Sequence, residues 1–242
     1  MSKIIQSKRS VIVAADVLDI TSLGGLAAGM KGVAGIGGFK IGLALGLKNL
    51  KVAVSVVKRI LGSDFPVIYD HQKGGNDIPE MGTQFAKVLK ESEVDAAILF
   101  PFAGPTTQEM WTKSCLDAGL QVLTGGVMTH SKFLVSEDGY IADESVEKIY
   151  RLACKLGIRH FVVPGNKIEW VKKIRSWLVE ELGEGNFVLY APGFITQKGD
   201  ISECGQAAGD EWHAIVGSAI YKQSTMEQQR QAAIEVTSQI AI

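Results

Sequence analysis

The sequence predicts a single (β/α)8 barrel that spans residues 1–242. Short apolar runs recur along the chain, and each is followed by a stretch with apolar residues at three- and four-residue spacing, which is typical of helices. The runs are nearly continuously apolar, as strands are when both faces of a parallel sheet are covered. A length of 242 residues suits one closed barrel, and no proline- or serine-rich linker divides the chain.

Each expected unit is a strand followed by a helix. The strands are VIVAAD (11–16), GGFKIG (37–42), FPVIYD (65–70), AAILFPF (96–102), QVLTGGVM (121–128), HFVVPG (160–165), FVLYAPG (187–193) and HAIVGSAIY (213–221). The helical stretches are 20–30, 45–61, 78–92, 106–119, 144–157, 167–182, 201–209 and 226–240. Eight such units fit a closed barrel better than an open doubly wound sheet.

The composition excludes several classes of protein. Hydrophobic residues make up 46% of the chain and charged residues 21%, so a large core is expected and disorder is not. The net charge of −1 predicts neither a nucleic-acid groove nor a membrane-binding surface. Cys115, Cys154 and Cys204 lack metal-ligand spacing and are interpreted as free thiols of a reducing compartment. With no apolar signal core and no membrane-spanning run, the expected location is the cytoplasm.

Charged residues stand at the ends of the first three expected strands, and barrel active sites lie at strand C-termini. Asp16 ends the first strand, Lys40 lies in the second, and Asp70 ends the third. Lys73 and Asp77 follow Asp70 within the decapeptide DHQKGGNDIP. We expect these five residues to converge on one mouth, where acids and bases can hold their charges by pairing.

This decapeptide resembles the Asp-x-Lys-x-x-Asp-Ile-Pro signature of the orotidine 5′-monophosphate decarboxylases. Ile78 and Pro79 favour this branch over the sugar-phosphate relatives that share the acid–base core. The resemblance extends over most of the chain, in VIVAAD, GFKIG, VLTGGVMTH, APGFITQKGD and IVGSAIY. The sequence is therefore identified as similar to this family, whose fold is a (β/α)8 barrel.

The spacing of the motif departs from the family pattern. Asp70-x-x-Lys73-x-x-x-Asp77 is longer by one residue in each interval, which gives Lys73 the wrong parity for a straight strand. A bulge, or a turn at Gly74 and Gly75, has to restore its position.

Ser218 is a second departure, because it stands where the family has an arginine that binds phosphate. Serine brings no charge and no bidentate fork. The phosphate then depends on backbone N–H groups, on Gln197 and on a lysine such as Lys198. Met81 also replaces the usual threonine of the third loop.

The resemblance implies decarboxylation of orotidine 5′-monophosphate to uridine 5′-monophosphate, the last step of de novo UMP synthesis, without a metal or an organic cofactor. It implies that Lys73 protonates C6 of the pyrimidine and that Asp70 lies near the substrate carboxylate. Lys40 would orient Asp70 and Lys73. Asp77 would complete the charge network of the neighbouring subunit in a homodimer.

The remaining roles that the resemblance implies concern substrate binding. Asp16 would accept a hydrogen bond from a ribose hydroxyl, and Thr129 would bind the pyrimidine. The other implied substrate contacts are Lys40, Ile78, Pro192, Gly193, Gln197, Gly217 and Ser218. His71 is assigned a supporting or interface role because the family has no catalytic histidine there, and His160 and His213 a structural one.

Three alternatives remain open at this point. The first is a sugar-phosphate decarboxylase or lyase that holds a divalent metal on its carboxylates. The second is an aldolase with Lys73 as a Schiff-base lysine, although flanking carboxylates raise a lysine pKa and disfavour that chemistry. The third is a non-catalytic relative that binds pyrimidine nucleotides.

Overall fold

The computed structural model describes residues 3–71, 74–194 and 199–240, which form a closed parallel barrel. The strands follow one another around the ring in chain order, and the last pairs with the first. They are β1 (Arg9–Ala15), β2 (Ile36–Ile41), β3 (Val67–Asp70), β4 (Ala96–Leu99), β5 (Gln121–Gly125), β6 (His160–Val162), β7 (Val188–Pro192) and β8 (Trp212–Val216). The predicted (β/α)8 barrel is confirmed.

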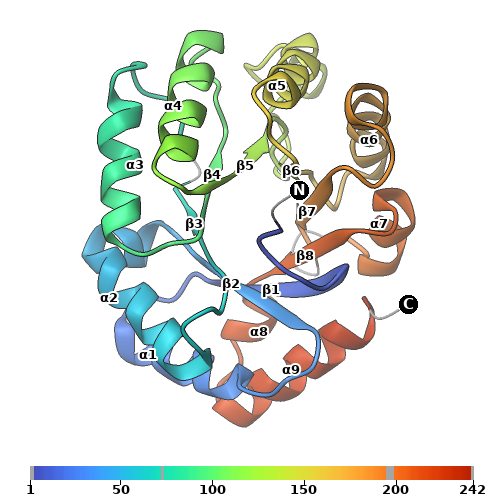
Figure 1. Ribbon diagram of the computed structural model, residues 1–242. Helices are drawn as coiled ribbons and strands as arrows, with labels where there is room; N and C mark the ends of the chain where they lie inside the picture. Colours follow the sequence, from blue (N-terminus) through green and yellow to red (C-terminus); the bar gives the residue numbers. More distant parts are fainter. Residues whose placement is uncertain (1–2, 72–73, 195–198, 241–242) are drawn as a thin grey trace.

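Helices surround the barrel on its outer side (Figure 1). They are α1 (Ile20–Met30), α2 (Leu43–Leu61), α3 (Met81–Glu91), α4 (Pro105–Asp117), α5 (Asp143–Lys155), α6 (Ile168–Leu182), α7 (Ile201–Ala208), α8 (Ser218–Tyr221) and α9 (Met226–Ser238), with a 3-10 turn η1 (Val135–Glu137) before α5. The three cysteines are free thiols, buried on α4, α5 and α7. Within the described ranges, no helix has the length and apolar character needed to cross a membrane.

The two largest differences from the sequence prediction lie in β8 and α2, and the expected strands 96–102, 121–128 and 160–165 also run three residues beyond β4, β5 and β6. The expected strand 213–221 is two elements, because β8 ends at Val216 and the chain turns at Gly217 into the short helix α8. The helix α2 is kinked at Asn49, whose extended backbone (φ −172°) interrupts it. The Asn49 side-chain oxygen accepts a hydrogen bond from the Val52 amide at 3.1 Å, so it caps the second helical segment.

Apolar side chains fill both sides of the barrel wall. Alternate strand residues such as Val13 and Phe39 pack under the helices, whereas residues such as Ile12 and Ile68 fill the interior. Ile5, from the segment before β1, is buried in the interior cluster, and in Figure 1 this segment crosses the middle of the ring. It packs against the start of β2 and closes that end, so the C-terminal ends of the strands form the open mouth.

Two histidines lie inside the barrel, as their structural assignment predicts. The Nδ1 atom of His213 is 2.8 Å from the Ser10 hydroxyl, and the Nδ1 atom of His160 is 3.1 Å from the Tyr190 hydroxyl. Burial, with smaller effects from His160 and Lys3, lowers the pKa of His213 to about 3. His213 is therefore neutral at physiological pH.

Candidate functional site

A cavity of about 340 Å³ opens at the C-terminal ends of the strands, within the size range of ligand pockets. Every strand or the loop after it contributes to its lining. A wider hollow of about 700 Å³ lies next to Lys8, Arg9 and Asp210, whose charged side chains are exposed or partly exposed to solvent. The cavity at the mouth is distinguished by buried charges.

Three charged side chains form an acid–base–acid array in this cavity. Lys40 Nζ lies 2.8 Å from Asp70 Oδ2 and 3.5 Å from Asp16 Oδ1. The Lys40 and Asp70 side chains are only 7% and 6% exposed, whereas the Asp16 side chain is 47% exposed. The array follows from strand order, because β2 lies between β1 and β3 and Lys40 reaches the carboxylates of both neighbours.

The two carboxylates keep Lys40 charged. Burial by itself lowers the pKa of Lys40, but the charges of Asp70 and Asp16 outweigh burial and raise that pKa above 10.5. Lys40 is therefore a permanent cation at neutral pH and can orient carboxylates but cannot act as a base.

The rest of the cavity wall divides into two parts. The side formed by β4, β5 and β6 is largely apolar and includes Phe100 and Met128. The side formed by β7 and β8 presents short residues, among them Gly193 and Gly217. Gly193 has φ +109°, and a Cβ atom there would lie 3.0 Å from Thr129 Cγ2, so only glycine fits without strain.

No protein-family model matches the sequence, and no curated protein matches it. Among solved structures, orotidine 5′-monophosphate decarboxylase from Methanocaldococcus jannaschii in complex with the inhibitor BMP superposes with a TM-score of 0.81 at 20% identity. The match covers 97% of this chain and 99% of that one. The Pyrococcus horikoshii orotidine 5′-phosphate decarboxylase gives a TM-score of 0.73 at 20% identity, covering 94% and 99%.

The chain has the fold of these decarboxylases. Most of the expected site residues surround its cavity: Asp16, Lys40, Asp70, Thr129, Pro192, Gly193, Gly217 and Ser218. Lys73, Gln197 and Lys198 lie outside the described residues.

Asp77 and Ile78 are not part of the cavity of their own chain. After Gly75, which has φ +89°, the Asn76 side chain accepts a hydrogen bond from the Phe102 amide at 2.8 Å. The Asp77 carbonyl then accepts a hydrogen bond from the Thr107 hydroxyl at 3.0 Å. These contacts dock the turn beside α4. Of the five residues expected at one mouth, the described part of the chain brings together Asp16, Lys40 and Asp70.

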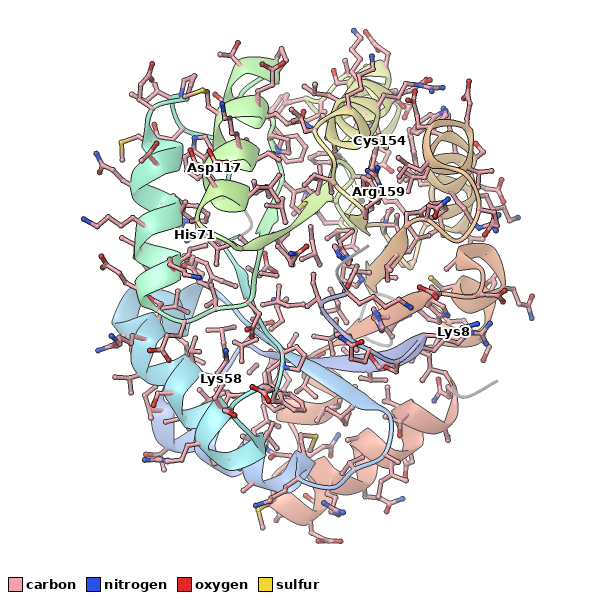
Figure 2. All side chains as sticks on the ribbon, viewed as in Figure 1. Lys8, Lys58, His71, Asp117, Cys154 and Arg159 are labelled. Atoms are coloured by element: carbon pink, nitrogen blue, oxygen red, sulfur yellow. The ribbon has the colours of Figure 1, made fainter. Side chains whose placement is uncertain are left out.

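His71 points away from the cavity. Its Nδ1 atom lies 2.7 Å from the Tyr69 hydroxyl, and its ring packs edge-on against Phe85 of α3. Figure 2 shows His71 between β3 and α3. Strand alternation explains the placement, because Tyr69 and His71 share the outward face while Asp70 faces inward. The location agrees with the supporting role that the sequence suggested.

Several lining residues were not among the predicted site residues, and Phe100, Met128, Tyr221 and Lys222 matter most for a ligand. Phe100 and Met128 lie near the C-terminal ends of the expected strands 96–102 and 121–128, so their position could have revealed them. Tyr221 and Lys222 were missed because the last strand was expected to continue to residue 221. With the turn at Gly217, both residues return to the cavity.

Proposed function

We propose that this chain decarboxylates orotidine 5′-monophosphate to uridine 5′-monophosphate. The observation that carries the proposal is the array of Lys40 between Asp16 and Asp70 at the mouth of the barrel, in which Lys40 and Asp70 are buried. Burying a lysine and a carboxylate costs desolvation free energy. A merely structural turn at the surface would have no reason to bury these charges, whereas a binding site would. Further support comes from the decapeptide that begins at Asp70 and from a fold shared with known decarboxylases along nearly the whole chain.

The cavity suits the three parts of this substrate. The pyrimidine fits the apolar side near Phe100 and Met128, with Thr129 at its edge. The ribose fits beside Asp16, whose half-exposed carboxylate can accept a hydrogen bond from a hydroxyl. The phosphate fits the β7–β8 side, where Gly193 leaves space for it.

In the proposed reaction, the bond between C6 and the substrate carboxylate breaks and CO2 leaves with its oxygen atoms. The electron pair stays on C6 as a carbanion that has no conjugated electron sink. An ammonium group beside C6 offsets the developing charge and donates the proton that completes uridylate. We assign this donor to Lys73, and to Lys40 the task of holding Asp70 near the departing carboxylate.

We also propose a homodimer in which Asp77 completes the site of the partner subunit. Asp77 and Ile78 lie outside the cavity of their own chain, and Ile78 is 59% exposed. Leu18 and Leu47, in the segments that follow β1 and β2, are also exposed. We propose that these exposed apolar side chains belong to the surface through which the two subunits associate.

Subunit mixing tests the shared site. Asp77→Ala and Lys73→Ala proteins are each expected to be inactive, whereas exchanged subunits regain activity because one mixed site is intact. The same mixture without subunit exchange is the control. Exchange that is verified by mass but restores no activity would contradict a shared site.

The activity test follows the ultraviolet absorbance of orotidine 5′-monophosphate with metal-stripped protein and excess chelator. Turnover under these conditions is the expected result, and Lys73→Ala is expected to lose turnover while still binding uridylate. Activity on sugar phosphates that disappears with chelator would favour the metal-dependent alternative. Uridylate binding without turnover would overturn the proposal in favour of a nucleotide-binding relative.

A further inference from the structure

The β7–β8 side of the cavity lacks an arginine at position 218, yet it presents another cation. We propose that Lys222 binds the substrate phosphate and replaces the charge that Ser218 does not supply. This inference rests on the proposed function, because it takes the phosphate of a nucleotide as the ligand.

The short helix α8 brings Lys222 to this part of the cavity. The Lys222 amide donates a hydrogen bond to the Ser218 carbonyl at 3.3 Å, so the chain turns back on itself. As a result Ser218 and Lys222 both line the cavity, together with Gly217 and Tyr221. An extended strand would have carried Lys222 away from the mouth.

The charges of the cavity leave Lys222 available for an anion. Among the described residues that line it, the charged side chains are Asp16, Lys40, Asp70 and Lys222. Lys40 is held by both carboxylates, at 2.8 and 3.5 Å. Lys222 is exposed and forms no ion pair within the described part of the chain. A phosphate dianion is repelled by the two carboxylates and attracted to Lys222.

The chemistry of the two side chains together matches the missing group. An ammonium is a point charge with three donors and is a common phosphate ligand. A serine hydroxyl donates one further hydrogen bond. Ser218 and Lys222 thus offer charge and donors from two positions, where an arginine offers both from one.

The test compares binding of uridylate and of uridine by calorimetry. Lys222→Met is expected to weaken uridylate binding by about 10- to 100-fold, the range for one charge-assisted contact, and to leave uridine binding unchanged. The matched control is Lys51→Met, an exposed lysine of α2 outside the cavity, which should change neither affinity. Adding Ser218→Arg to Lys222→Met should restore uridylate affinity. Lys222→Gln gives a second measurement if the methionine variant unfolds.

The outcomes separate this proposal from the reaction itself. If wild-type protein binds uridylate through Lys222 but does not decarboxylate orotidine 5′-monophosphate, Lys222 stands and the proposed reaction fails. If Lys222→Met and Lys222→Gln bind uridylate as tightly as wild type while turnover is normal, the role of Lys222 is overturned and the reaction stands. Wild-type protein that binds neither uridylate nor inorganic phosphate would overturn both.

Discussion

Breaking the pair between Lys40 and Asp70 should destabilise the fold. The charged atoms lie 2.8 Å apart, and both side chains are more than nine-tenths buried, so water screens them weakly. With an effective dielectric constant of about 20, the attraction at that distance is about 6 kcal/mol before desolvation is subtracted. Removing one partner of a buried pair typically costs about 3–5 kcal/mol. We expect Lys40→Met to lower the free energy of unfolding by about that amount.

Urea denaturation followed by circular dichroism measures the effect. Asp70→Asn should cost a similar amount, and the double variant should be more stable than the sum of the single changes by about 2 kcal/mol. The matched control is the pair of Lys172 and Glu169, also 2.8 Å apart but 58% and 86% exposed. Lys172→Met should change stability by less than about 1 kcal/mol. If Lys40→Met costs no more than this control, burial does not set the strength of the pair and the reasoning fails.

The pH dependence follows from the raised pKa of Lys40. The folded state holds the Lys40 proton more tightly than the unfolded state. The contribution of charged Lys40 to the free energy of unfolding is therefore complete below pH 10.5 and declines as the pH rises further. The stability difference between wild type and Lys40→Met should be constant from neutral pH to about pH 10 and narrow above it. If burial outweighed the carboxylates, the folded state would lose the proton first, and the stability difference between wild type and Lys40→Met would instead widen as the pH rises toward 10.5.

Two further predictions concern single positions. A Cβ atom at Gly42 would lie 2.3 Å from Asp16 Oδ1, so Gly42→Ala should displace that carboxylate and raise the KM of the proposed reaction about tenfold, as expected for one lost hydrogen bond to a charged group. The control is Gly25→Ala on α1, where a Cβ atom meets no neighbour within 4 Å. If the KM is unchanged in the Gly42→Ala and Gly25→Ala variants alike, Asp16 does not bind the ribose. The lowered pKa of His213 means that the unfolded state takes up a proton first as the pH falls below 6.5. The stability advantage of wild type over His213→Gln should therefore shrink by about 2 kcal/mol between pH 7 and pH 5 in urea titrations. No change would mean that His213 takes up its proton in the folded state as readily as in the unfolded state.

The sequence was sufficient to predict the barrel and the array because both depend on regular features. Apolar runs mark strands, and the residue that ends a run marks the mouth of the barrel. Asp16, Lys40 and Asp70 belong to three consecutive strands, and consecutive strands of such a barrel are neighbours. Their proximity therefore follows from chain order alone.

The positions that were not predicted depend on backbone turns. The residues after Val216 are apolar enough to continue a strand, and nothing in their composition reveals that Gly217 redirects the chain. For Asp77, the deciding contact joins Asn76 to Phe102, residues 26 positions apart. Long-range hydrogen bonds of this kind leave no local pattern in the sequence.

The array around Lys40 and the β7–β8 side of the cavity are therefore constrained differently by the fold. Lys40 can meet both carboxylates only from β2, between β1 and β3, so a lysine moved by one position would face the helices instead of the cavity. The cation that we propose for the phosphate, Lys222, follows β8 in a turn, where positions 218 and 222 both line the cavity. In this proposal, a lysine at position 222 serves the purpose of an arginine at position 218. This difference explains how a chain only 20% identical to M. jannaschii orotidine 5′-monophosphate decarboxylase can lack the expected arginine and still be proposed to bind the same phosphate.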